Sequence, residues 1–148
     1  MSHENRLSAL GITLPPAPAP VATYAPAVFS GTLLFVSGQI SAAKGHLGAD
    51  MSVQQGYDAA RGCGLALLAQ ARAALGSLYR VVRVVKLTGF VASTPDFTDQ
   101  PEVINGASDL MVEVFGDEAG RHARAAVSAP ALPRGVAVEV DAIFEVAP

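Results

Sequence analysis

Residues 120–144, GRHARAAVSAPALPRGVAVEVDAIF, form an Ala/Val-rich segment in which the charged residues Arg124 and Glu139 fall on predicted strands. The composition predicts two short strands joined by a Pro/Gly turn, with Arg124 opening the first strand and Glu139 in the middle of the second. A guanidinium on a rigid strand end can bind a small carboxylate at two points. A lone arginine before a strand also fits a surface charge or an ion-pair partner, so the segment alone leaves these interpretations open.

The second strand of this segment divides its side chains between two faces. A core face is formed by Val136, Val138, Val140, Ala142 and Phe144, and the other face carries Ala137, Glu139, Asp141, Ile143 and Glu145. The carboxylate of Glu139 fits a solvated outer face. Because Ala137 and Ile143 share that face, it also fits a half-buried surface such as a subunit interface.

The other reactive residue types form weaker patterns. His122 would share a face with Arg124 if the chain is extended there, although a loop histidine is more often incidental. Cys63 falls inside a predicted helix, near its packed stripe, where we expect a structural thiol. Ser37 and Gly38 follow a predicted strand, but two residues define no site. The sequence contains no G-x-S-x-G elbow, no phosphate-binding P-loop and no G-x-G-x-x-G turn after a strand.

The composition narrows the class of protein. A length of 148 residues predicts one domain over residues 1–148. Charged residues make up only 16% of the chain and hydrophobic residues 51%, which predicts surface that is buried against other subunits. A net charge of −3 without a basic run disfavours nucleic acid or an anionic membrane as the partner. One cysteine, and three histidines without metal-ligand spacing, predict neither a disulfide framework nor a metal site.

The first half of the chain contains clear element signals. Residues 1–21 are punctuated by prolines and predict an extended lead-in, with no apolar h-region of a secretory signal. Two strands are predicted in ATYAPAVFSGTLLFVSGQI. A helix over residues 53–75 is indicated by a capping box of Ser52 and Gln55 and by a stop at Gly76. No apolar run is long enough to span a membrane, so we expect a cytoplasmic protein.

The second half alternates strand and helix patterns. A β-branched run predicts a strand from Val81 to Val91, and a helix is predicted from Pro101 to Phe115, ended by Gly116. The closing strands are predicted at residues 123–128 and 136–146. The order ββαβαββ, without an internal repeat or linker, predicts one α+β domain.

Three segments together resemble the RidA (YjgF/YER057c/UK114) family. They are Y…G…LLFVSGQI, VVKLTGFVASTPDF and AR…LP…VAVEVDAI, and the match runs from about residue 17 to 147. The last segment is the most specific, because Arg124, Pro133 and Glu139 reproduce the family's R-x(8)-P-x(5)-E spacing. The motifs LTGFV, VINGASDL, VFGD and GRHAR are similar to those of a longer bacterial subgroup labelled endoribonuclease L-PSP-like.

The resemblance implies a chorismate-mutase-like α+β fold, with one mixed sheet and two helices on one face. It also implies a homotrimer whose sheets face a central barrel and whose three clefts lie between subunits. The best-studied members of the family hydrolyse reactive 2-aminoacrylate-type enamines and imines to 2-keto acids and ammonia, and the resemblance implies the same activity for this chain. These members use no metal and no organic cofactor.

The family's site residues transfer to named positions of this chain. By the resemblance, Arg124 clamps the substrate carboxylate and Glu139 positions or activates the attacking water. Tyr24 lines the cleft from the neighbouring subunit, and Ser37 and Gly38 border the pocket. Asn105 is our choice for the family's helix asparagine, with Ser108 as the alternative. We expect Arg124 and Glu139 to lie on neighbouring strands of a hairpin.

The chain departs from the family directly after the arginine. Many active members carry a small polar residue and then a cysteine there, where this chain has Ala125 and Ala126. The change alters the shape and polarity of the pocket, and with them the expected substrate range. A non-catalytic trimeric binder of small carboxylates is the main alternative function. An endoribonuclease is a weaker one because of the net negative charge, and a chorismate mutase rests on fold analogy alone.

Overall fold

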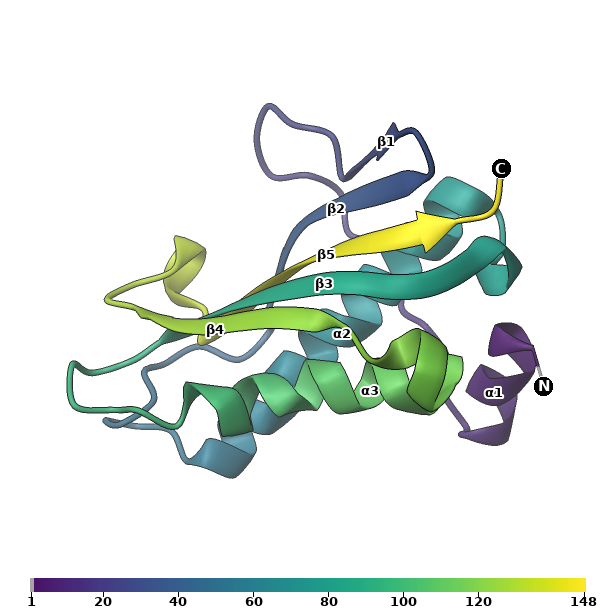
Figure 1. Ribbon diagram of the computed structural model, residues 1–148. Coiled ribbons are helices and arrows are strands. Elements are labelled where there is room, and N and C mark those ends of the chain that lie inside the picture. The colour runs from purple at the N-terminus through teal and green to yellow at the C-terminus, as the bar shows by residue number, and fades with distance from the viewer. Residues whose placement is uncertain (1) are drawn as a thin grey trace.

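A five-stranded mixed sheet forms one layer of the protein and two long helices form the other, in the computed structural model of residues 2–148 (Figure 1). The elements are α1 His3–Ala9, β1 Ala27–Ser30, β2 Leu33–Ile40, α2 Val53–Leu75, the 3₁₀ turn η1 Leu78–Arg80, β3 Val81–Ala92, α3 Gln100–Gly120, β4 Ala123–Ala129, the 3₁₀ turn η2 Pro133–Gly135 and β5 Val138–Val146. The fold is α+β, as predicted, and the chain begins with one helix more than the predicted order ββαβαββ.

The strand order is β1-β2-β5-β3-β4, and only the β3–β4 pair is parallel. Helix α3 provides the crossover between β3 and β4, which parallel strands require. Strand β5 inserts between β2 and β3 and pairs antiparallel with both. The prediction that β4 and β5 form a hairpin is therefore wrong, because β3 lies between these two strands and pairs with both.

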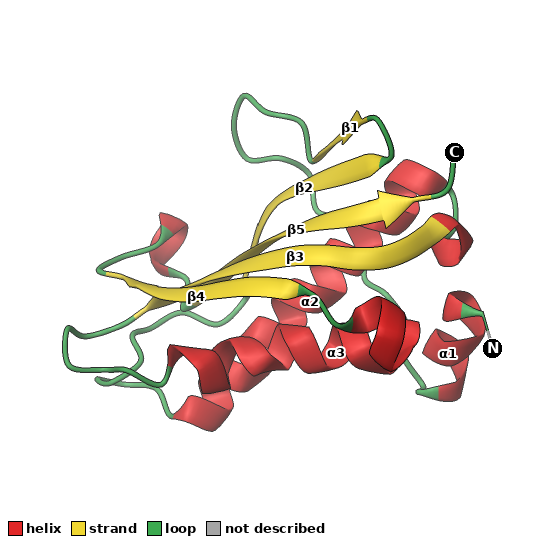
Figure 2. Ribbon diagram, viewed as in Figure 1, coloured by secondary structure: helices red, strands yellow, loops and turns green. Residues whose placement is uncertain are grey.

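Helices α2 and α3 cover one face of the sheet (Figure 2). The core between the layers contains Leu67, Leu110 and Phe144, all fully buried. The helices approach closely at Gly106, where a Cβ atom would collide with the Tyr57 carbonyl oxygen of α2. Among residues 2–148, no helix combines the length and the apolar composition that crossing a membrane requires.

The predicted limits of the two long helices are confirmed at the positions that carry local signals. Ser52 and Gln55 form the reciprocal capping box of α2, and Gly76 ends the helix in the left-handed region. In α3, Gly116 leaves the helical conformation at φ 87° and ψ 168°, and one further turn runs to Gly120. The glycine thus interrupts the helix where the sequence predicts its end.

The prediction of an extended lead-in is wrong for its first part, because His3–Ala9 is helical. Ser2 caps this helix by accepting the backbone N–H of Asn5 at 3.1 Å. The helix also docks on the body of the protein, where the Glu4 carboxylate accepts the backbone N–H of Leu78 at 2.7 Å. The prolines at 15–20 lie beyond this helix, in a segment without helix or strand.

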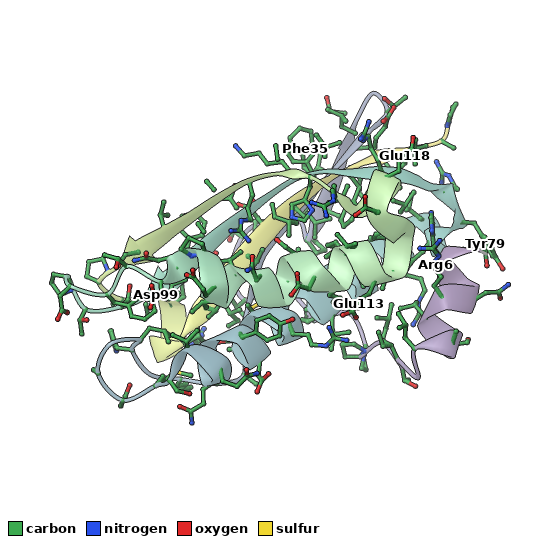
Figure 3. All side chains as sticks on the ribbon, turned by 60° about the horizontal axis from the view of Figure 1, so that its bottom comes forward. Arg6, Phe35, Tyr79, Asp99, Glu113 and Glu118 are labelled. Carbon is green, nitrogen blue, oxygen red and sulfur yellow. The ribbon has the colours of Figure 1, made fainter. Side chains whose placement is uncertain are left out.

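The sheet face opposite α2 and α3 is uncovered in the single chain. Phe35, Val28 and Ile40 on β1 and β2 and Val127 on β4 are exposed there, at 41%, 54%, 37% and 44%. Figure 3 shows Phe35 on the side of the sheet that points away from α3. An apolar sheet face of this kind is typical of a subunit interface.

Candidate active site in two parts

Arg124 projects from β4 towards the helix layer. It is in register with Leu87 of β3, which is fully buried beneath the helices, so the two side chains share that face of the sheet. Its Nη1 donates to Asn105 Oδ1 at 2.8 Å and to Ser108 Oγ at 3.2 Å, and Nη2 has a long contact of 3.5 Å with the Pro101 carbonyl oxygen. Helix α3 therefore holds the guanidinium from one side.

The acceptors for Arg124 follow the helical repeat. Pro101, Asn105 and Ser108 are four and three residues apart, which places them on one stripe of α3 beside β4. The sequence left Asn105 and Ser108 as alternatives for one position, and the structure brings both to the same Nη1 atom. Both hydrogens of Nη1 are used in this way.

His122 extends this arrangement, and sequence reasoning set it aside as incidental. Its Nδ1 lies 2.7 Å from the Gly120 carbonyl oxygen and its Nε2 lies 2.8 Å from Ser108 Oγ. Burial, and secondarily the Arg124 charge, lower the pKa of His122, while its bond to Gly120 opposes the shift. The RHAR spacing was the only sequence signal for it. We call Arg124, Asn105, Ser108 and His122 the Arg124 cluster; it borders a depression of about 570 Å³.

Glu139 lies with a different group of predicted residues. Together with Tyr24, Ser37 and Gly38 it lines a cavity of about 600 Å³, and we call these four the Glu139 cluster. Ser37 and Gly38 form an irregularity in β2, where the register with β5 shifts between Val36 and Gln39. A Cβ atom at Gly38 would collide with the Glu139 carboxylate, so a larger residue there would displace that side chain.

The segment before β1 forms the outer wall of this cavity. Ser37 Oγ donates to the Ala25 carbonyl oxygen at 2.7 Å, and Gln70 Nε2 donates to the Pro18 carbonyl oxygen at 2.6 Å. These bonds fasten the proline-rich segment to β2 and α2. Tyr24, with 44% of its surface exposed, stands at the end of the segment facing solvent.

The Glu139 carboxylate is electrostatically disfavoured. Burial raises its pKa, and the neighbouring Asp141 carboxylate raises it further. Within residues 2–148, no protein hydrogen bond or ion pair compensates this charge. A half-buried carboxylate with a raised pKa is a common property of acid–base groups in enzymes.

The two clusters lie on opposite faces of the sheet. Arg124 shares the face of Leu87, whereas Glu139 is in register with Phe90 and Ile40 on the uncovered face. Two strand spacings and three residues along the strand separate their backbones by about 14 Å. One small substrate therefore cannot contact both side chains of the same chain.

Two further predictions concern Ala126 and Cys63. Ala126 is in register with Gly89 and lies on the face of Arg124, partly buried against the core. Cys63 is fully buried in α2, with its thiol 3.5 Å from the Val138 carbonyl oxygen. Burial raises the pKa of this thiol to about 12, which makes it unreactive.

A family model described as "YjgF/chorismate_mutase-like, putative endoribonuclease" matches residues 4–145. The chain belongs to the YjgF/RidA family. The fold is accordingly the YjgF/chorismate-mutase-like fold, in agreement with the strand and helix arrangement described above.

Relatives support this membership over nearly the whole chain. Protein TCP17 of Trypanosoma cruzi is 53% identical over 145 residues, which is 94% of this YjgF/RidA-family chain and 91% of the relative. The crystal structure of Atu1372 from Agrobacterium tumefaciens is 48% identical with a TM-score of 0.89, covering 98% of this chain and 92% of that one. The structure of Escherichia coli TdcF with bound serine is 25% identical with a TM-score of 0.63, covering 88% and 94%.

Proposed function

We propose that this protein hydrolyses reactive enamines and imines of the 2-aminoacrylate type, giving a 2-keto acid and ammonia. We further propose that it does so as a homotrimer, in clefts that combine the Arg124 cluster of one subunit with the Glu139 cluster of the next. The observation that carries the proposal is the state of the Arg124 guanidinium. Both N–H groups of its Nη1 are occupied by α3, and within residues 2–148 no protein acceptor binds its Nε.

This arrangement suits the recognition of a carboxylate. The Nε–H and one Nη2–H form a single edge of the guanidinium, and that edge matches the two oxygens of a carboxylate. The bonds of Nη1 to Asn105 and Ser108 reduce the freedom of the side chain before a ligand arrives, which lowers the entropic cost of binding. The serine bound to TdcF is an amino acid, and it therefore carries a carboxylate like the proposed substrate.

Glu139 has the properties that the hydrolytic step requires. The enamine first tautomerises to an imine, whose C2 is electrophilic. A water oxygen forms a bond to C2 while Glu139 accepts a proton from that water. Glu139 returns this proton to the nitrogen, which gives the neutral tetrahedral amino alcohol. Glu139 then carries the hydroxyl proton to the amino group as the C–N bond breaks and the C=O bond forms, so that ammonia leaves a 2-keto acid. A raised pKa improves Glu139 as a base near neutral pH.

The trimer is supported by the uncovered face of the sheet and by the low charge content of the chain. A second copy packed on this face would cover Phe35 and Val127. A site that takes Arg124 from one subunit and Glu139 from the next would also account for the two clusters of one chain lying on opposite faces.

The test is an assay with 2-aminoacrylate, generated in place by a serine dehydratase, in which pyruvate and ammonia release are followed. We expect the protein to accelerate release above the spontaneous rate and Arg124→Ala to abolish the acceleration. Binding of pyruvate without acceleration would replace this proposal by the non-catalytic binder. Cleavage of RNA that is lost in Arg124→Ala would favour the endoribonuclease named in the family description.

A further inference from the structure

The Arg124 cluster contains a hydrogen-bond chain whose direction can be worked out. A carbonyl oxygen only accepts, so His122 Nδ1 must carry the hydrogen that lies towards Gly120. In neutral His122 the other nitrogen, Nε2, is then an acceptor, and Ser108 must donate its O–H to it. The lone pairs of Ser108 Oγ are thereby directed to the remaining neighbour, which is Arg124 Nη1.

In this hydrogen-bond chain, each group determines the protonation or orientation of the next. Gly120 sets the tautomer of His122, His122 sets the orientation of the Ser108 hydroxyl, and that hydroxyl accepts a hydrogen of Arg124. The burial and the nearby cation that lower the pKa of His122 keep it in the neutral form on which the chain depends. Asp109, Glu113 and Arg121 are the other charged groups of this depression.

We infer that His122 and Ser108 are positioning residues that orient the free edge of Arg124 for the substrate carboxylate. They act through the guanidinium and form none of the reacting bonds. The inference rests on the proposed function for its ligand, whereas the hydrogen-bond chain itself can be observed without one.

The first arm of the test measures binding of 2-oxobutyrate by calorimetry and turnover by ammonia release. We expect Ser108→Ala and His122→Leu each to weaken binding and raise KM by about threefold to tenfold, the range of one lost hydrogen bond, with kcat nearly unchanged. Because both residues act through the same hydrogen-bond chain, the double variant should lose no more affinity for 2-oxobutyrate than either single variant. His122→Gln, which keeps an acceptor near Ser108, should restore most of the affinity. The control is Val112→Ala, because Val112 lines the same depression but takes no part in the hydrogen-bond chain.

The second arm is ligand-free nitrogen NMR of the wild-type protein. We expect His122 to be neutral and protonated on Nδ1. Protonation on Nε2 would overturn the inference, and so would additive losses in the double variant or unchanged binding in both single variants. If Arg124→Ala also binds 2-oxobutyrate normally, the proposed function itself fails. If Arg124→Ala loses binding while Ser108→Ala and His122→Leu keep it, only the positioning role fails.

Discussion

Arg124 and Glu139 lie on opposite faces of one sheet, with strand β3 between their strands. Each is surrounded by its own group of predicted site residues, one group on α3 and the other on the irregular part of β2. The family spacing R-x(8)-P-x(5)-E therefore connects two separate clusters of a single chain.

Mixed trimers test whether a complete site forms between subunits. Arg124→Ala and Glu139→Gln should each be inactive alone, yet their co-expression should restore activity, because one interface then combines an intact Arg124 with an intact Glu139. Random assembly of equal amounts should recover about a quarter of the wild-type rate per site. Co-expression of Glu139→Gln with the Arg124→Ala/Glu139→Gln double variant is the control. Absence of recovery would contradict a site that is shared between subunits.

Arg124 is expected to determine ligand affinity. Its replacement by alanine should cost about 2–5 kcal/mol of 2-oxobutyrate binding, as when one partner of a desolvated charge pair is removed. Arg124→Lys should not fully restore binding, because an ammonium group lacks the planar fork that contacts Asn105 and a carboxylate together. Calorimetry measures both variants, and full affinity in the lysine variant would argue against two-point recognition.

Glu139 is expected to determine the rate. Glu139→Gln keeps the shape of the side chain beside Gly38 but removes the base, so kcat should fall by about 10²–10⁴-fold while 2-oxobutyrate affinity changes little. The measurement is ammonia release at saturating imine. An unchanged kcat would assign Glu139 a structural role.

The raised pKa of Glu139 also predicts a pH dependence of stability. Burial, and then Asp141, raise this pKa in the folded state, so the folded protein binds the proton more tightly than the unfolded chain. The free energy of unfolding of the wild type should therefore fall as the pH rises from the ordinary glutamate pKa through the raised one. Glu139→Gln lacks this loss. Urea unfolding should show the variant gaining stability relative to the wild type between acid and neutral pH, and a constant difference would contradict the assigned cause.

The uncovered sheet face is expected to hold the oligomer together. Phe35→Glu places a charge on this face and should convert the proposed trimer into monomers at micromolar concentration, because a buried unpaired charge is costly. Tyr79→Glu is the matched control, since Tyr79 is exposed on η1 at one end of the molecule, apart from Phe35 (Figure 3). Sedimentation velocity distinguishes the two outcomes. A monomeric wild type would exclude the inter-subunit site.

Several features of the protein follow from local sequence. The capping box of Ser52 and Gln55 and the stop at Gly76 determine the ends of α2, because each acts on backbone groups within a few residues. The strand over residues 81–92 follows from its β-branched run. The candidate residues Arg124 and Glu139 were identified by type and spacing.

The tertiary structure decided how these elements and residues meet. Whether β5 pairs with β4 or inserts beside β3 depends on contacts between distant segments, which no local propensity specifies. The observed pairing places Arg124 and Glu139 on separate faces of the sheet. The tertiary structure also brings His122 within hydrogen-bond distance of Ser108. The helix His3–Ala9 is likewise held by Glu4 on the distant Leu78 as well as by its own cap. Local signals therefore determine the elements and the candidate residues, whereas long-range pairing determines which of those residues form a common site.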